Sequence, residues 1–118
     1  MIRINKYKIF QNLLLLVAMI VSMNHNLVAQ EKKTFTIQIE NHKFKPEILE
    51  VPADIAFTLT IENLDKTVEE FESDDLRQEK IIGGGKKINL EIKPLKVGEY
   101  KFFGEFHSKT ARGKIIVK

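Results

Sequence analysis

Apolar and polar residues alternate along much of the chain, and this pattern predicts a series of short β-strands. The clearest runs are TFTIQIE at residues 34–40, IAFTLTIE at residues 55–62 and GEYKFF at residues 98–103. In each run about every second residue is apolar, which is the period of a strand that turns one face to a core. The run at residues 55–62 is the strongest, and we expect Phe57 and Leu59 to be buried on the same face of a central strand.

Turn-forming residues separate these runs from shorter ones. Weaker alternation is found at residues 47–51, 67–72, 88–92 and 115–117, and the segments between carry most of the Pro, Gly, Asn and Asp residues. No stretch after residue 30 keeps a helical period over three turns. Seven to eight short strands at spacings of about 8–12 residues predict an all-β Greek-key β-sandwich. Tyr100 suits a tyrosine corner in such a fold, the alternative being an ordinary half-buried tyrosine.

The first 30 residues have a different character. Arg3, Lys6 and Lys8 precede an apolar run at residues 13–21, and a cleavage point follows near Ala29 or Gln30. This is the pattern of a secretory signal peptide. The alternative, an uncleaved membrane anchor, needs about 20 apolar residues, more than this run provides. We therefore expect a helical signal peptide at residues 1–30 and an exported, periplasmic domain at residues 31–118.

The charge balance changes once the leader is set aside. The chain has 19 Lys and Arg and 16 Asp and Glu, and three of the basic residues precede residue 31. Residues 31–118 therefore carry 16 charges of each sign, which gives no support to nucleic-acid binding. The chain has no cysteine, so disulfides and thiolate chemistry are excluded. No nucleophile motif, phosphate-binding loop or dinucleotide-binding glycine pattern indicates an enzyme.

The C-terminal sequence GEYKFFGEFHSKTARGKIIVK, residues 98–118, resembles the ending of the cupredoxins. In that family a Tyr-x-Phe strand leads to a Cys, a His, a short loop, a Gly and the final strand. FKPEILEVPA at residues 44–53 and IENLDK at residues 61–66 resemble cupredoxin segments in the same order. The resemblance covers nearly all of residues 34–118 and implies the cupredoxin sandwich, whose C-terminal loop holds most of the copper ligands.

The positions that bind type 1 copper in the resembled family are mostly changed here. Glu69 stands at the first His position, Gly104 at the Cys position, and Thr110, Ala111 and Arg112 where a Met is expected. Only His107 remains, and a blue copper centre needs a Cys. The candidate metal ligands that remain are His107, Glu69 and Glu105.

An imidazole with carboxylates suits copper(II), iron(II) or zinc at a non-blue site with positions open to water. The alternative is that His107 is bonded to backbone and the glutamates are solvated. His42, in a turn beside Lys43, is expected at the surface and not as a ligand. Residues 69–79 form the densest acidic stretch, which would attract a cation or a basic partner, although a solvated loop is the interpretation that the sequence favours.

A closer resemblance concerns residues 70–73 (EFES) and 102–106 (FFGEF). They are similar to the exported cupredoxin-like proteins of bacterial Ftr-type ferrous iron uptake systems. This implies an accessory metal-binding component of iron or copper uptake, whose partners are an iron permease or an exported iron-binding protein. The alternative is a metal-free interaction domain that docks on a membrane permease or exported partner, with the membrane reached only through that partner. A weaker third expectation is oxidation of ferrous iron by His107 and the carboxylates.

Overall fold

The computed structural model describes residues 6–12 and 31–118. The chain divides into two units, Met1–Glu31 and Lys32–Lys118, and each is described by itself. Residues 6–12 of the first unit form a helix. The apolar run at residues 13–21 and the cleavage point of the expected signal peptide lie outside the described residues. Within residues 6–12 and 31–118, no helix has the length and apolar character needed to cross a membrane.

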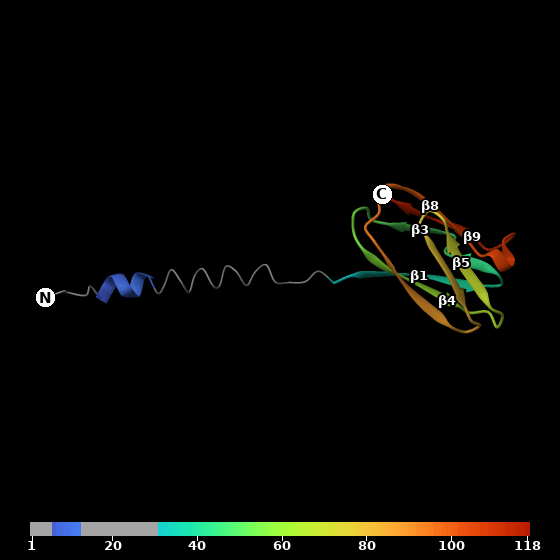
Figure 1. Cartoon of the computed structure of the whole chain (residues 1–118), viewed down its shortest axis with the longest axis horizontal. Coiled ribbons are helices and arrows are strands. Elements are labelled where there is room, and N and C mark those ends of the chain that lie inside the picture. The colour runs from blue at the N-terminus through green and yellow to red at the C-terminus, as the bar shows by residue number, and fades with distance from the viewer. Residues whose placement is uncertain (1–5, 13–30) are drawn as a thin grey trace. The chain divides into compact units, whose positions relative to one another are not determined.

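The second unit is an all-β sandwich of two sheets (Figure 1), as the sequence predicts. One sheet has the order β2-β1-β4-β7 and the other β3-β9-β8-β5-β6. The strands are β1 (Lys33–Glu40), β2 (Lys43–Lys45), β3 (Ile48–Val51), β4 (Phe57–Asn63), β5 (Glu69–Ser73), β6 (Gln78–Ile82), β7 (Lys87–Ile92), β8 (Gly98–Phe103) and β9 (Arg112–Val117). Nine strands are present among the described residues instead of the expected seven or eight, because the edge strands β2 and β6 form in segments that the sequence predicts as turn and loop.

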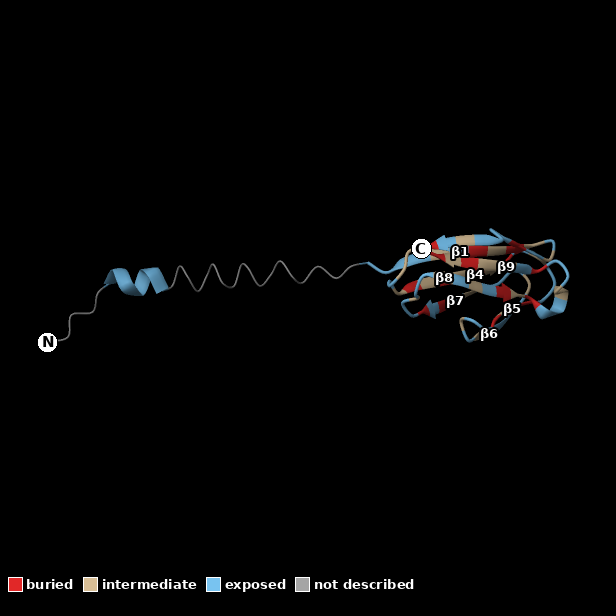
Figure 2. Ribbon diagram, turned by 90° about the horizontal axis from the view of Figure 1, so that it is seen from above, coloured by how far each residue is buried: buried red, intermediate tan, exposed pale blue. Residues whose placement is uncertain are grey.

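The core is built from the alternating strands, as Figure 2 shows by the buried bands along them. On β4, Phe57, Leu59 and Ile61 are buried and the residues between them are half-buried. The prediction that Phe57 and Leu59 share a buried face is therefore confirmed. Ile55 is more exposed than its place in the alternating pattern predicts, because the strand begins only at Phe57.

Three phenylalanines form an aromatic cluster near one end of this core. The ring centroids of Phe44 and Phe102 lie 5.0 Å apart, edge to face, and those of Phe71 and Phe102 lie 5.2 Å apart. Phe44 follows His42 by two residues and Phe71 follows Glu69 by two residues. Because residues two apart on a strand point the same way, Phe71 anchors the start of β5 that carries Glu69, and Phe44 anchors β2 directly after the turn that carries His42.

All the buried hydrophobic side chains among the described residues lie between Ile37 and Val117, inside the second unit. The Tyr100 hydroxyl donates a hydrogen bond of 2.8 Å to the Lys96 carbonyl, the bond of a tyrosine corner. Residues 32–118 thus contain their own core and their own strand pairings, which are what a domain needs to fold by itself.

Candidate metal centre

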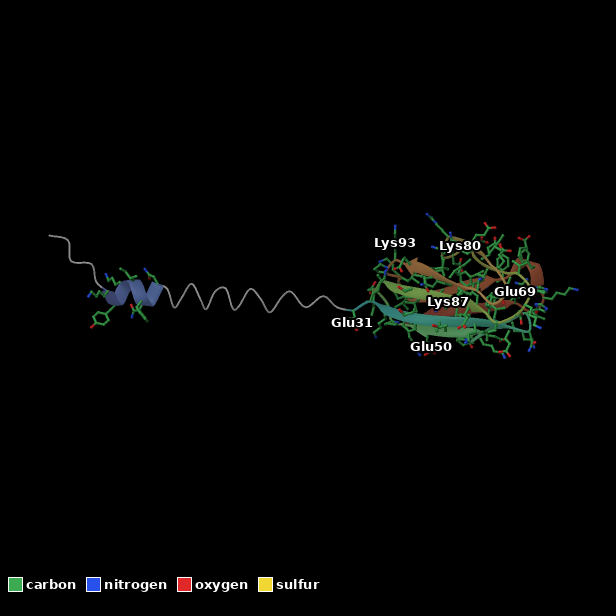
Figure 3. All side chains as sticks on the ribbon, turned by 90° about the horizontal axis from the view of Figure 1, so that it is seen from below. Glu31, Glu50, Glu69, Lys80, Lys87 and Lys93 are labelled. Atoms are coloured by element: carbon green, nitrogen blue, oxygen red, sulfur yellow. The ribbon has the colours of Figure 1, made fainter. Side chains whose placement is uncertain are left out.

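Three side chains from separate parts of the chain meet at one end of the sandwich. His42 lies in the β1–β2 turn, Glu69 is the first residue of β5, and His107 is the last residue of the short 3₁₀ helix η2 (Glu105–His107). Figure 1 shows the turn and η2 at the same end of the sandwich. In Figure 3 the Glu69 label marks that end, and Lys93 lies toward the other.

Both histidines contact the carboxylate of Glu69. His42 Nδ1 lies 2.6 Å from Glu69 Oε1, and His107 Nδ1 lies 3.0 Å from the same oxygen and 3.1 Å from Oε2. The two imidazole rings stack, with their centroids 3.6 Å apart and their planes inclined by 16°. One ligand atom from each of the three residues lies within 4.8 Å of the other two.

Glu69 is fully buried, whereas the two histidines remain partly open to solvent. The side chain of Glu69 is 1% exposed, and those of His42 and His107 are 40% and 33% exposed. A buried carboxylate needs partners, because removing its charge from water is costly. The two imidazoles are those partners, and their exposed edges leave a path from solvent to the group.

The β1–β2 turn directs His42 toward this group. Asn41 and His42 both have positive φ, 52° and 60°, as the two central residues of a type I′ hairpin turn require. Their backbone N–H groups donate to the Asp65 carboxylate over 2.8 and 3.0 Å. Burial raises the pKa of Asp65, but these hydrogen bonds and the charges of the imidazoles of His42 and His107 lower it below its ordinary value of 3.8.

Buried Asn63 orders the loop that links β4 to β5. Its side-chain amide donates to the carbonyl of Thr67 over 2.8 Å and to that of Ile82 over 3.1 Å. Its side-chain oxygen accepts a hydrogen bond of 3.0 Å from the N–H of Asp65. One side chain therefore fixes both the loop that carries Asp65 and the entry into β5 at Glu69.

Gly104 sets the position of η2 and therefore of His107. A Cβ added at Gly104 would lie 2.7 Å from the Glu70 carbonyl oxygen and 3.2 Å from Ala111 Cβ. The N–H of Gly104 donates to the Ala111 carbonyl, and the N–H of Ala111 donates to the His107 carbonyl. The loop thus packs directly on β5, and only glycine fits at the position where the resembled family carries its cysteine.

The structure brings together Glu69 and His107, two of the three residues that the sequence singled out. Glu105 lies outside this group: it is exposed at the start of η2, two residues before His107. The sequence favoured a surface position for His42 over a role as a ligand. The ring is indeed partly exposed, but its Nδ1 lies 2.6 Å from Glu69 Oε1, so His42 joins the group that the sequence assigned to Glu69 and His107. Whether a metal binds stays a prediction.

Two imidazole nitrogens and one carboxylate oxygen make a donor set of known chemistry. Two histidines and one carboxylate with open positions are typical of iron(II), and imidazole also suits copper and zinc. The same three groups can hold one another without a metal, through hydrogen bonds from the imidazoles to the carboxylate. Both arrangements depend on the same placement of the β1–β2 turn.

Asp65→Asn is expected to destabilise the protein near neutral pH and to have less effect in acid. The folded state lowers the pKa of Asp65, so this carboxylate adds stability above its ordinary value of 3.8 and loses it as the pH falls through the lower folded value. Denaturant melts between about pH 6 and about pH 2.5 should show the difference between wild type and Asp65→Asn shrinking with acidity. Asp74→Asn, at an exposed aspartate, is the control, and an equal pH trend in both variants would contradict the prediction.

The comparisons with known proteins agree with this fold. The sequence pattern of the cupredoxin-like domain matches residues 12–117. An uncharacterized protein of Rickettsia prowazekii (strain Madrid E) is 52% identical over 81 residues, which are 69% of this chain and 65% of that relative. This chain therefore spans about two thirds of the length of the curated relative that it matches.

Solved structures with the same fold include copper proteins. The metal binding domain of the copper(I)-exporting P-type ATPase of Streptococcus pneumoniae D39 superposes with a TM-score of 0.66 at 16% identity, over 77% of this chain and 90% of that one. Auracyanin A, a blue copper protein of Chloroflexus aurantiacus, superposes with a TM-score of 0.63 at 14% identity, over 75% of this chain and all of that one. At such low identity these likenesses show the fold alone.

Proposed function

The chain belongs to the cupredoxin-like domain family, and we propose that it binds a divalent metal ion through His42, Glu69 and His107. The observation that carries the proposal is the convergence of both Nδ1 atoms on the buried Glu69 carboxylate. The three residues come from three separate elements, so their meeting depends on the tertiary fold and not on neighbouring positions in the sequence. A binding role for the group explains why a fold of this size keeps a buried carboxylate there.

The distances within the group are those of neighbouring ligands around an ion. Two ligand atoms that each lie about 2.1 Å from an ion, about 90° apart, are about 3 Å from each other. The two Nδ1 atoms lie 2.6 and 3.0 Å from Glu69 Oε1. The fold therefore already holds both Nδ1 atoms near the separation that neighbouring ligands have from one carboxylate oxygen.

A type 1 copper centre does not fit this chain. Such a centre takes a thiolate ligand, the chain has no cysteine, and Gly104 leaves no room for a side chain at the corresponding position. The nitrogen and oxygen donors suit copper(II), iron(II) or zinc without an intense blue colour. Copper(II) should bind most tightly by the general affinity order, whichever ion the protein meets in the cell.

The wider role that we propose is accessory metal handling in iron or copper uptake, in the periplasm. Its support is the resemblance of residues 70–73 and 102–106 to exported proteins of ferrous iron uptake systems. An iron permease or an exported iron-binding protein would then be the partner, and a leader at residues 1–30 would direct export. Partly solvent-exposed histidines suit a protein that transfers an ion to a partner, since they leave ligand positions on the ion free for exchange.

Titration of residues 31–118 with copper(II), followed by calorimetry and electron paramagnetic resonance, tests the metal proposal. Wild type should bind one ion with hyperfine coupling to two nitrogens and without an intense blue band. His42→Ala and His107→Ala should each lose one nitrogen and weaken binding by about 10–100-fold or more. His42→Ala is the sharper of the two variants, because the copper positions of the resembled family do not include this residue.

The double variant His42→Ala/His107→Ala is the control for copper held by the chain terminus, because it leaves residues 31–118 without histidine. Equal copper binding by wild type and the double variant, or no binding by wild type, would remove the metal centre. The hydrogen-bonded group would then be structural, and the metal-free docking domain would take the place of the present proposal. Iron(II) titrated without oxygen gives the same comparison for the second expected ion.

A further inference from the structure

A second group of carboxylates lies on the opposite face of β5. Glu69 and Phe71 point into the sandwich, so the pleat of the strand turns Glu70 and Glu72 to the outer face of the sheet. One carboxylate oxygen from each of Glu70, Glu72 and Glu79 lies within 4.8 Å of the other two. We call these three residues the outer carboxylate group, and none of them belongs to the metal centre.

The strand register places two of these carboxylates against each other. Glu72 on β5 is directly paired with Glu79 on β6. Glu70, two positions before Glu72 on β5, is paired with Ile81. Like charges directly opposite each other on antiparallel strands are destabilising. None of the ion pairs found between described residues includes a member of the outer carboxylate group. No lysine or arginine of the described residues therefore forms a direct ion pair with these carboxylates.

Glu70 is the buried member of the group. It is 3% exposed, and its Oε1 atom is buried without a hydrogen-bond partner among the described residues. A buried carboxylate oxygen without a partner is costly, and native proteins leave few of them. Where such an oxygen does occur, it commonly contacts an ion or a bound water, or it serves a functional role. Here the carboxylate lies beside two others, which favours an ion.

The negative charges around Glu72 also favour a bound cation. Its pKa is raised first by a hydrogen bond with Glu70, then by burial and by the negative charges of Glu70, Glu105 and Asp74. A hydrogen bond between two carboxyl groups needs a proton on one of them. Either a proton on one carboxyl group or a cation between them would neutralise the crowded oxygens. Glu105, which the sequence placed with His107, acts here on the outer carboxylate group.

We propose that Glu70, Glu72 and Glu79 form a second metal site, which takes a hard divalent cation such as manganese(II) or calcium. All the ligand atoms are carboxylate oxygens, the donors that manganese, calcium and magnesium prefer. The absence of nitrogen donors from these three residues separates this site from the metal centre. Glu69 and Glu70 are adjacent on β5 and face opposite ways, so one strand carries a ligand for each site.

Manganese(II) alone is the probe for this site. The sharp resonance spectrum of the free ion weakens as it binds, so titration of residues 31–118 gives the affinity directly. Wild type should bind manganese(II). Each of the variants Glu70→Gln, Glu72→Gln and Glu79→Gln should bind it about 10-fold or more weakly than wild type. Glu79 is exposed, so Glu79→Gln keeps the test valid even if the buried Glu70→Gln fails to fold.

Two matched controls isolate the site. Glu50→Gln removes one exposed carboxylate from β3, at the other edge of the same sheet, and should bind manganese(II) as wild type does. His107→Ala removes a ligand of the metal centre and should also leave manganese(II) binding unchanged. No binding by wild type, or wild-type binding by Glu79→Gln, would overturn the proposal. Loss of manganese(II) binding in His107→Ala would place the ion at the metal centre and would also overturn the proposal. The copper(II) test of the metal centre is independent of this result, because it is read from the hyperfine coupling to nitrogen.

Discussion

Leu59→Ala is expected to lower the free energy of unfolding by about 2–5 kcal/mol. Leu59 is 0% exposed in the middle of β4, and its strand partners are Phe35 on β1 and Leu90 on β7. Alanine would leave a cavity that strands hydrogen-bonded on both sides cannot close. The chain has no disulfide to limit the loss, and a small domain has only about 5–15 kcal/mol of stability in total.

Denaturant melts of residues 31–118 measure this change. Thr60→Ala is the matched control, because Thr60 is the next residue of β4, points to the other face and makes an exposed hydrogen bond with Asn89. This control should change the free energy of unfolding by under about 1 kcal/mol. A loss of less than about 0.5 kcal/mol for Leu59→Ala would contradict the placement of β4 at the centre of the core.

The alternating pattern is fullest in the central strand β4 and weakest in β2 and β6, the two strands that it missed. β4 has a neighbour on each side and one buried face, so its sequence carries the two-residue period in full. β6 is an edge strand with a single buried residue, Ile82, and β2 buries only Phe44. Edge strands of this kind are decided by their partners and not by their own pattern. The sequence therefore predicted the fold class and the core but not the number of strands.

The candidate site depends on contacts that a local pattern does not contain. Glu69 and His107 are 38 residues apart, and only the resemblance to a copper-binding family gave a reason to consider them together. His42 is 27 residues from Glu69, and it reaches the carboxylate because Asp65 holds a turn with two positive φ angles. A histidine at the second position of a two-residue hairpin loop between alternating runs is the one local sign that could have pointed to it.

Glu70 shows that the outer carboxylate group, too, could not be predicted from a local sequence pattern. The sequence marked residues 69–79 as acidic and favoured a solvated loop. In the structure Glu69 and Glu70 are both buried, one on each face of β5. Gly104 packs against the Glu70 carbonyl, and such contacts between distant segments are not encoded in the composition. Acidic residues that look alike in the sequence therefore differ in their surroundings and in their expected chemistry.

Glu69→Gln is expected to weaken copper(II) binding by about 100-fold or more, since even residues behind the ligands of metal sites change affinity by about 10–100-fold. Glutamine keeps the shape of the buried side chain, so the aromatic cluster beneath it should stay packed. Its amide oxygen is neutral and its NH₂ group is a donor, so one end of the side chain can no longer accept a hydrogen bond or bind a cation. The charge that draws a cation between the two imidazoles is lost with the substitution.

Calorimetry with copper(II) on wild type, Glu69→Gln and Glu99→Gln measures this effect. Glu99 is an exposed carboxylate on β8 that pairs with Lys114, so Glu99→Gln removes the same charge away from the metal centre and should bind as wild type does. The manganese(II) affinity of Glu69→Gln should also remain that of wild type, because Glu69 faces away from the outer carboxylate group. Copper(II) binding by Glu69→Gln within about 3-fold of wild type, in a variant that melts as a folded protein, would mean that the two histidines hold the ion without the carboxylate. The metal centre would then be a two-histidine site, and buried Glu69 would serve only to orient the imidazoles.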